Sequence, residues 1–197
     1  MKPRLVVFAK APVIGGAKTR LAAGIGKVQA WRLHRAMTAR ILRAVTDPRW
    51  ETVLAVSPDS AASRRFPRVW PVDIARIPQG DGDLGVRQMR VFGARRPVCV
   101  IGTDAPQIVR ADIAATFAAL KRHDAVIGPA ADGGYWLLAL DAPAPAILFD
   151  GVRWSHPQTG ADLEARLRAC ALGRIARLRV LRDIDRASDV RAGFSGR

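Results

Sequence analysis

Short apolar segments alternate along the chain with longer segments in which apolar residues recur every three or four positions. The segments 4–9 (RLVVFA), 51–57 (ETVLAVS) and 97–102 (PVCVIG) are apolar, so we predict buried strands there. Over 27–45 the apolar residues follow helical spacing, and Asp47-Pro48 ends the predicted helix. The same criteria predict strands at 69–77 (a weak or edge strand, because of Pro71), 124–128, 135–140 and 175–181, helices at 84–92, 111–122 and 163–172, and a short helix from Ala187.

This alternation of strands and helices favours an α/β fold, a three-layer α/β/α sandwich with a mostly parallel mixed sheet. The sequence has no internal repeat, linker or low-complexity tract, so residues 1–197 are expected to form a single domain. Ligands of such sheets bind beyond the carboxyl ends of the strands. The polar loops that follow the predicted strands should therefore meet at one rim: 10–20, 79–85, 103–106, 132–134 and 183–185.

The first loop lies in FAKAPVIGGAKTRLA and combines glycines with cations. Gly15 and Gly16 permit close approach of backbone to a ligand, and Lys10, Lys18 and Arg20 supply positive charge for phosphates. A Walker A loop would need glycines where Pro12 and Ala17 stand, which argues against a P-loop nucleotidase. The alternative is a solvated loop whose charges contact nothing.

A second polar motif, GTDAP, directly follows the predicted strand at 97–102. Its carboxylate, Asp104, is well placed to hold a divalent cation such as Mg²⁺, which keeps waters and shares the phosphates of its substrate. The alternative for Asp104 is a helix cap or an Asx turn.

Two glycine-rich segments are further candidates. In QGDGDLG, Gln79 and the main chain could contact a nucleobase or ribose, or Asp83 could cap the following helix. In DGGYWL, Asp132 is a candidate general base, with one of the late aspartates as the alternative, and the aromatic pair Tyr135 and Trp136 fits both ligand contact and packing. His34 and His123 fall on helical segments and are expected to be packing or surface residues.

Composition limits the function classes. The formal net charge is +15, but the 32 cations comprise 27 Arg and 5 Lys spread over nearly every predicted helix, with no helix-turn-helix or RNP-like pattern. We therefore do not expect nucleic-acid binding, whereas a basic surface favours anionic small substrates. No apolar run approaches the ~20 residues of a membrane span, and no signal peptide is evident, so a cytoplasmic location is expected. Cys99 and Cys170 are expected to be buried, reduced thiols.

Six motifs, in this order, resemble the DUF2064 family of bacterial glycosyltransferase-like proteins, and the resemblance runs from about Leu5 to Val190. They are FAKAPVIGGAKTRL, QGDGDLGVR, GTDAP, DGGYWLLAL, FDGVRWS and RDIDRASD. The resemblance implies a GT-A, nucleotide-diphospho-sugar transferase fold, distantly similar to molybdenum cofactor guanylyltransferase and phospholactate guanylyltransferase. The chain departs from the family pattern at Ile14, Ala105, His156 and Arg186.

The resemblance also implies a site. Lys18 and Arg20 would contact the donor phosphates and act with Asp104 in catalysis, and Asp104 would hold Mg²⁺ or Mn²⁺ with help from a late acid, Asp185 (Asp183 is the other candidate). The expected donor contacts are Lys10, Ala11, Pro12, Gly15, Gly16, Lys18, Arg20, Gln79, Gly80, Gly82, Asp83, Asp132, Gly133 and Gly134.

The expected reaction is metal-assisted transfer from a nucleotide or nucleotide-sugar donor to a small-molecule acceptor, most simply of a glycosyl group. Attack at the α-phosphorus instead would make a nucleotidyltransferase of the guanylyltransferase type, and the same residues serve both reactions. A non-catalytic nucleotide or nucleic-acid binding protein is the remaining alternative.

Overall fold

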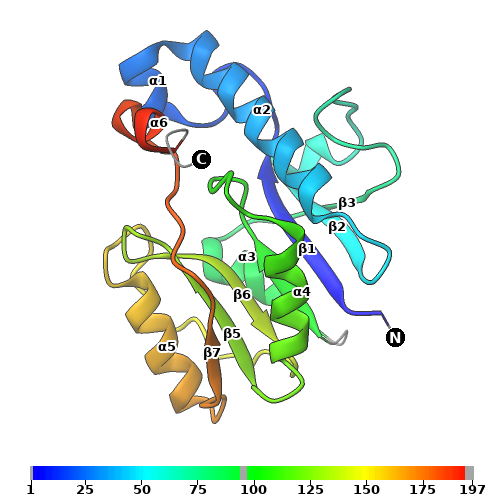
Figure 1. The fold of residues 1–197 in the computed structure, drawn as a ribbon, viewed down its shortest axis with the longest axis vertical. Helices are drawn as coiled ribbons and strands as arrows, with labels where there is room; N and C mark the ends of the chain where they lie inside the picture. Colours follow the sequence, from blue (N-terminus) through cyan, green and yellow to red (C-terminus); the bar gives the residue numbers. More distant parts are fainter. Residues whose placement is uncertain (1, 94–96, 194–197) are drawn as a thin grey trace.

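A seven-stranded mixed sheet forms the centre of the protein (Figure 1). The computed structural model describes residues 2–93 and 97–193. The strands are β1 (Arg4–Lys10), β2 (Glu51–Ser57), β3 (Ala75–Pro78), β4 (Val98–Ile101), β5 (Ala125–Pro129), β6 (Tyr135–Leu140) and β7 (Ile175–Arg177). The helices are α1 (Thr19–Ile25), α2 (Lys27–Val45), α3 (Leu84–Val91), α4 (Arg110–Ala119), α5 (Thr159–Ala169) and α6 (Ala187–Gly193), with a 3₁₀ turn η1 (Asp59–Ala61).

The strand order is β3-β2-β1-β4-β6-β5-β7. Only one of these strands, β6, runs against its neighbours: it pairs antiparallel with β4 and β5, whereas the pairs β1–β2, β1–β4, β2–β3 and β5–β7 are parallel. This arrangement confirms the predicted mostly parallel α/β sheet.

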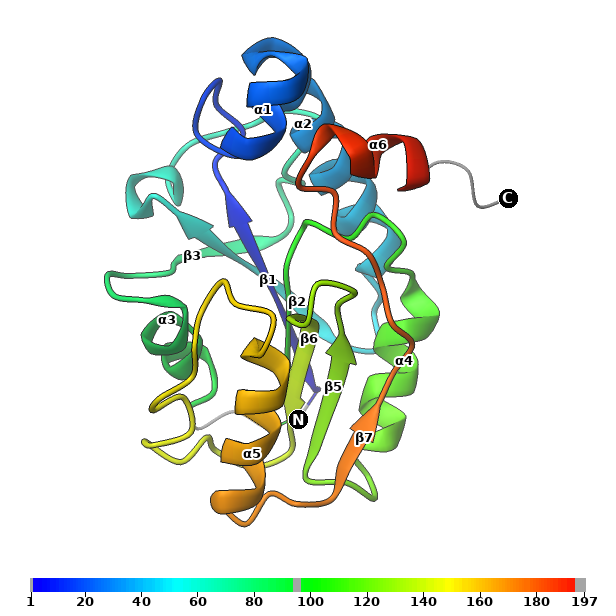
Figure 2. The ribbon, with the colours of Figure 1, turned by 90° about the vertical axis from the view of Figure 1, so that its left-hand side faces the viewer.

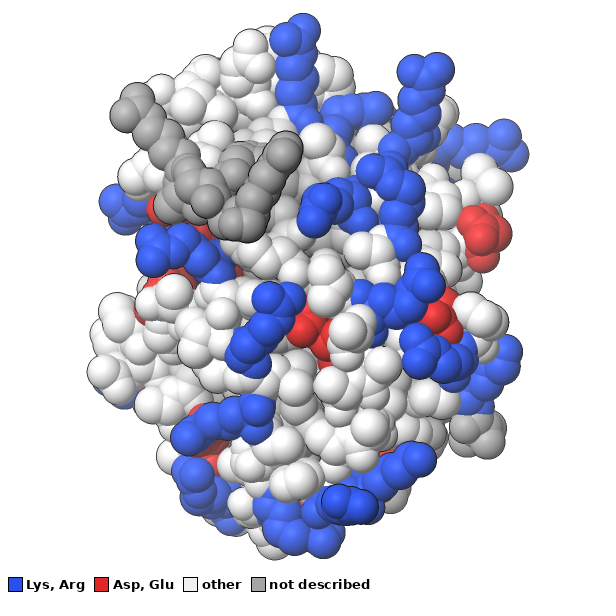
Figure 3. All heavy atoms as spheres, in the orientation of Figure 1, with Lys and Arg blue, Asp and Glu red and all other residues white. Residues whose placement is uncertain are grey.

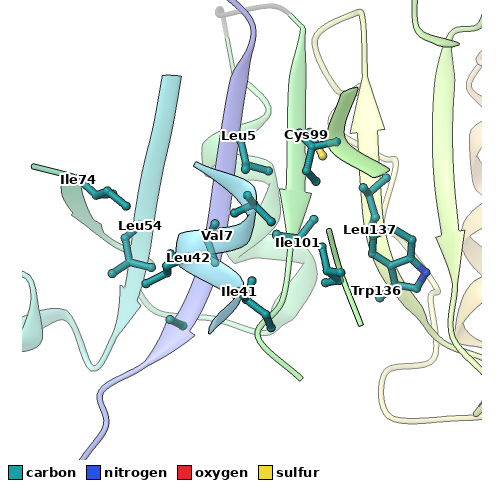
Figure 4. Packing of buried hydrophobic residues seen from close by; sticks show 14 of the residues in the cluster. Leu5, Val7, Ile41, Leu42, Leu54, Ile74, Cys99, Ile101, Trp136 and Leu137 are labelled. Atoms are coloured by element: carbon teal, nitrogen blue, oxygen red, sulfur yellow. The ribbon is translucent and has the colours of Figure 1, made fainter. Parts of the chain in front are cut away.

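Helices cover both faces of the sheet and complete the three layers (Figure 2). On one face, α2 and α4 pack on alternate strand residues, with Ile41 and Leu42 of α2 lying against Leu5 and Val7 of β1 (Figure 4). On the other face, α3 and α5 pack on the strand residues of opposite parity. Because both faces are buried, the strands are almost continuously apolar, which is why the sequence reveals them so clearly.

The predicted bounds of α2, β2 and β6 agree with the structure, and those of α4 (predicted 111–122) and α5 (predicted 163–172) are misplaced at both ends. Three further differences are larger or change the type of element. First, α1 lies where the sequence indicated only loop; it is seven residues long and buries only Leu21, too short a pattern to be recognised. Second, the strand predicted at 69–77 is confined to Ala75–Pro78, because Val69, Trp70 and Ile74 reach the core from turns. Third, the last strand ends at Arg177 rather than at 181.

The carboxyl ends of the parallel strands face α1 and α6, which lie side by side at that end of the molecule (Figures 1 and 2). A Cβ on Gly24 of α1 would lie 2.8 Å from that of Ala187 at the start of α6, so the two helices are in close contact. The end of the described chain is thereby brought over the loop that follows β1. Among the described helices, none is sufficiently long and apolar to cross a membrane.

Candidate functional site

A cleft of about 880 Å³ opens at the carboxyl ends of the parallel strands. All five loops that the sequence placed at one rim contribute to its wall, including Lys18 from the first, Gln79 from the second and Asp104 from the third. A smaller, mainly apolar cavity of about 480 Å³ lies at the opposite end of the sheet, near Pro3, Trp50 and Phe117. We take the larger cleft as the candidate site, because the charged residues of the loops converge there.

The centre of the site is one ammonium group held by oxygens of two distant segments. The Nζ of Lys18 lies 2.5 Å from Oδ1 of Asp104 and 2.7 Å from Oδ1 of Asp185, and it donates to the carbonyl of Ile184 at 2.6 Å. The Lys18 side chain is only 5% exposed, whereas both carboxylates are nearly half exposed. Burial alone would lower the pKa of Lys18, but Asp104 and Asp185 outweigh it and hold this pKa above 10.5.

A third carboxyl group, that of Asp183, lies beside this cluster, and its negative charge has little stabilisation from its surroundings. Its Oδ1 is buried and has no hydrogen-bond partner among the described residues. Burial, followed by repulsion from Asp104, Asp132 and Asp185, raises the pKa of Asp183 to about 7, although Lys18 opposes the shift. The cluster therefore holds more negative charge than the Lys18 ammonium neutralises.

This donor set fits a hard divalent cation. Asp104 and Asp185 converge on a single cationic atom, and carboxylate oxygens are the ligands that Mg²⁺ and Mn²⁺ take. In the described part of the chain, no group of three or more His, Cys, Asp or Glu side chains is arranged to hold a metal by itself. The fit is thus to a cation that completes its shell with water and substrate oxygens, as Mg²⁺ does.

The first loop is braced from α2. The indole of Trp31 donates to the carbonyl of Pro12 at 2.7 Å, and Nε2 of His34 lies 3.2 Å from the carbonyl of Lys10. Lys18 has the left-handed backbone conformation (φ 57°) just before α1 begins, and Arg20 is exposed in the first turn of that helix. Lys10, Lys18 and Arg20 line the cleft, whereas Ala11, Pro12, Gly15 and Gly16 lie outside its wall.

The second loop contributes mainly structure. Gln79 lines the cleft, but its Nε2 donates to the carbonyl of Ala55 at 2.9 Å. Asp83 caps α3 by accepting the Val86 amide at 2.9 Å, the alternative that the sequence left open. Gly80, Gly82 and Asp83 lie outside the cleft wall.

The turn between β5 and β6 packs on the segment that leads into α5. A Cβ on Gly133 would lie 1.9 Å from the carbonyl oxygen of Pro157, so only glycine fits there. Asp132 and Gly134 line the cleft, and Gly133 stands behind them. Asp132 is exposed and accepts the Gly134 amide at 2.9 Å, which orients the carboxylate.

Several residues that the sequence did not suggest as site residues also line the cleft, among them His34, Arg87 and Trp154. His34 of α2 is buried, and burial lowers the pKa of its imidazole, although the hydrogen bond to the Lys10 carbonyl acts in the opposite direction. Arg87 of α3 and Trp154 line the opposite side. Arg87 ends the QGDGDLGVR motif, and that position was the signal that could have drawn attention to it.

The positive charge of the chain is spread broadly. Figure 3 shows Lys and Arg side chains across one whole face, from α2 to the opposite end, with acidic groups between them. Many arginines are engaged in pairs, such as Arg174 with Asp124 at 2.6 Å and Arg153 with Asp162 at 2.7 Å. On the face that Figure 3 shows, the described cations do not form a single basic stripe of the kind that binds nucleic acid.

Solved structures share this fold. A protein from Desulfovibrio desulfuricans G20, described as a candidate nucleotide-diphospho-sugar transferase, is 25% identical, with a TM-score of 0.86 over 94% of this chain and 84% of that one. The 4-diphosphocytidyl-2C-methyl-D-erythritol synthase of Anaerococcus prevotii DSM 20548 has a TM-score of 0.59 at 11% identity, over 98% and 94% of the two chains. Glucosyl-3-phosphoglycerate synthase of Mycobacterium tuberculosis, in complex with Mn²⁺, UDP and phosphoglyceric acid, has a TM-score of 0.58 at 10% identity, over 97% and 73%.

The architecture is therefore that of the GT-A and nucleotidyltransferase folds. Residues 38–156 match the family described as "Uncharacterized protein conserved in bacteria (DUF2064)", and the chain belongs to this family. No curated protein matches the sequence significantly.

Proposed function

We propose that this protein is a divalent-metal-dependent transferase that uses a nucleotide-sugar donor. The observation that carries the proposal is the convergence of Asp104 and Asp185 on one buried cation, Lys18, inside a cleft at the carboxyl ends of the strands. The cleft volume of about 880 Å³ falls in the range of small-molecule sites, which suits a nucleotide diphosphate joined to a sugar.

The comparisons support the donor class. The relative with 25% identity is described as a candidate nucleotide-diphospho-sugar transferase, and the mycobacterial synthase of the same fold was solved with Mn²⁺ and UDP. The cations on the cleft wall, Lys10, Lys18 and Arg20, supply the charge that a diphosphate requires.

In this proposal Asp104 and Asp185 hold Mg²⁺ or Mn²⁺. Such an ion acts as a Lewis acid and neutralises charge on a departing phosphate. The Lys18 ammonium, which neutralises the two carboxylates in the structure, would then turn to the donor phosphates. Arg20 stabilises the same phosphates from the first turn of α1, and Asp132 is the candidate base for the acceptor hydroxyl.

The expected donor contacts fall into residues that line the cleft and residues that lie outside its wall. Lys10, Gln79 and Gly134 would meet the donor directly, since they line the cleft, and Asp132 would act between donor and acceptor. Ala11, Pro12, Gly15, Gly16, Gly80, Gly82, Asp83 and Gly133 would shape the loops that carry these groups.

Nucleotidyl transfer is the second candidate, because the fold is shared with a cytidylyltransferase-type synthase. The products separate the two reactions: glycosyl transfer releases a nucleoside diphosphate, whereas nucleotidyl transfer from a triphosphate releases pyrophosphate. A protein that binds nucleotide without turnover would release neither.

A thermal-shift panel of nucleoside triphosphates and nucleotide sugars, with and without Mg²⁺ or Mn²⁺, tests the donor and the metal together. Ligand at about a hundred times its dissociation constant adds ~2.7 kcal/mol, which raises the melting temperature by roughly 5–10 °C in a domain of this size. The best donor is then incubated with sugar phosphates, and the released diphosphate or pyrophosphate is measured.

Matched variants decide the residue roles. Asp104→Asn should abolish the metal-dependent part of the shift, whereas Asp73→Asn, an exposed carboxylate outside the cleft, should not. Arg20→Ala should weaken nucleotide binding, and Lys27→Ala, an exposed cation at the start of α2, serves as its control. A full metal-dependent shift in Asp104→Asn would refute the metal assignment, and no shift with any nucleotide would refute the donor.

A further inference from the structure

The cleft continues beneath its rim along the sheet face that α3 and α5 cover. Phe8, Val100 and Tyr135 of the sheet line this part and belong to the packing on that face. The opposite wall comes from Arg87 and Gln88 of α3 and from the ring of Trp154. We call these six residues the inner chamber. None of them belongs to the Asp104–Lys18–Asp185 cluster.

Arg87 is the unusual member of the chamber. It is half-buried, its Nε is fully buried, and no described residue accepts a hydrogen bond from it. Arg90, one turn further along α3, instead donates to the carbonyls of Gln79 at 3.1 Å and Asp81 at 2.5 Å. A buried cationic donor without an acceptor is costly, so Arg87 requires an acceptor that the described chain does not provide.

The buried Nε of Arg87 donates to no carboxylate oxygen among the described residues. The acidic residues among the described wall residues come from two loops and from the segment before and within α6. Asp104 and Asp185 pair with Lys18, and Asp189 accepts the amides of Asp185 and Arg186. Asp83, the residue before α3, accepts the amide of Val86. An anionic ligand in the cleft would supply the acceptor that the Nε of Arg87 lacks.

The rest of the chamber indicates what carries this anion. The Trp154 ring packs beside Gly85, where a Cβ would lie 2.9 Å from its Cζ2, and its centroid lies 5.9 Å from that of Phe149. The Tyr135 hydroxyl and the Gln88 amide are joined at 2.8 Å. Fixed aromatic surfaces beside a guanidinium suit a ring or short carbon skeleton that bears a phosphate or carboxylate.

We propose that the inner chamber binds the acceptor of the transfer reaction, and that this acceptor is a small phosphorylated or carboxylated molecule held by Arg87. This inference rests on the proposed function, since it assigns the donor to the rim. The same anionic chemistry could be carried by the donor, so the experiment must separate the two sources.

Isothermal titration of the full chain with inorganic phosphate, glucose 1-phosphate and 3-phosphoglycerate provides the test, with uncharged glucose as reference. Each probe is titrated into the protein alone and into protein saturated with Mg²⁺ and the nucleoside diphosphate that shifts its melting temperature most. We expect at least one anion to bind in both states. Arg87→Gln should weaken that binding about ten- to hundredfold, the effect of losing a charge-assisted bond, and leave nucleotide affinity within about twofold.

Arg43→Gln, an exposed arginine of α2 outside the cleft, is the matched control and should leave anion binding unchanged. Should Arg87→Gln fail to fold, the arginine Nε–H resonances of the wild-type protein give a second measurement, because a buried Nε–H that gains an acceptor shifts saturably with phosphate.

Three results would overturn the proposal: no anion binds the nucleotide-saturated protein, Arg87→Gln leaves anion binding intact, or it weakens nucleotide instead. The last result would assign Arg87 to the donor. If anion binding depends on Arg87 but no nucleotide raises the melting temperature, the anion site in the inner chamber stands and only the proposed nucleotide donor is refuted.

Discussion

Replacing Asp183 with asparagine should stabilise the protein at neutral and alkaline pH, because the native carboxylate is held in an unfavourable place. Its folded pKa is raised to about 7, by burial first and then by Asp104, Asp132 and Asp185. In the unfolded chain the group titrates near 3.9. Between these two values the folded state binds more protons than the unfolded state, so this group makes stability fall as pH rises.

The magnitude follows from the shift. About three pH units at ~1.36 kcal/mol each give about 4 kcal/mol of destabilisation, fully present above pH 7 and absent below about pH 4. Asparagine has nearly the same shape and no charge, so Asp183→Asn should exceed the wild type by about 2–4 kcal/mol above pH 7. The difference should shrink steadily as pH falls toward 4.

Urea unfolding of both proteins, followed by tryptophan fluorescence at a series of pH values from 4 to 8.5, measures this difference. Other titrating groups cancel when the two curves are subtracted, and Asp73→Asn controls for removing an exposed carboxylate. Saturating Mg²⁺ should narrow the gap, since a cation beside Asp104 relieves the repulsion. A difference independent of pH, or a less stable asparagine variant at pH 8, would show that the charge of Asp183 is not under strain.

Three further changes have defined outcomes. Lys18→Met removes the ammonium between Asp104 and Asp185, so it should destabilise the protein by about 1–3 kcal/mol in thermal melts. The two carboxylates are then free for a metal ion, so the variant should bind Mg²⁺ more tightly than the wild type does. Weaker Mg²⁺ binding would show that the Lys18 ammonium and the metal ion do not compete for these carboxylates. Gly133→Ala places a Cβ against the Pro157 carbonyl at a φ of 88° and should cost more than about 2 kcal/mol in urea unfolding, whereas Gly173→Ala, with nothing within 4 Å, should be nearly neutral. Cys99 is fully buried, and burial raises the pKa of its thiol, so Ellman's reagent should label the half-buried Cys170 first and reach Cys99 only on unfolding; rapid labelling of Cys99 in the native protein would refute its burial.

Local pattern was enough to predict most of the fold. Strand β2 and helix α2 have the predicted bounds for two reasons. The strand is a continuous apolar run and the helix has apolar residues at helical spacing, and each ends at a turn that contains proline. Helix α1 was missed because seven residues with one buried side chain carry no such pattern. Val69, Trp70 and Ile74 were misread as strand, because burial in turns gives the same apolar signal as burial in a sheet.

The candidate site divides in the same way. The topology rule predicted that Lys18 and Asp104 would share a rim, since each lies in the loop that follows a parallel strand. The same rule placed 183–185 at this rim, but the ion pair between Lys18 and Asp185, 167 residues apart, depends on the path of the chain after β7, which no local pattern encodes. Arg87 was missed for a related reason: a polar residue on a helix is normally solvated, and the burial of its Nε is set by tertiary packing that the local sequence does not reveal.

The two parts of the cleft are electrostatically incomplete in opposite senses. At the rim, Asp104 and Asp185 share the buried ammonium of Lys18, and burial, followed by repulsion from neighbouring aspartates, raises the pKa of Asp183. In the inner chamber the buried Nε of the half-buried Arg87 has no hydrogen-bond acceptor among the described residues. A carboxylate placed beside Arg87 instead of at the rim would stabilise both parts of the cleft. The chain keeps its carboxylates at the rim and its guanidinium in the chamber, which points to ligands that bring the missing charges. A metal-bound donor at the rim and an anionic acceptor in the chamber would satisfy both parts at once, and they would bring the acceptor to the donor with each charge already matched.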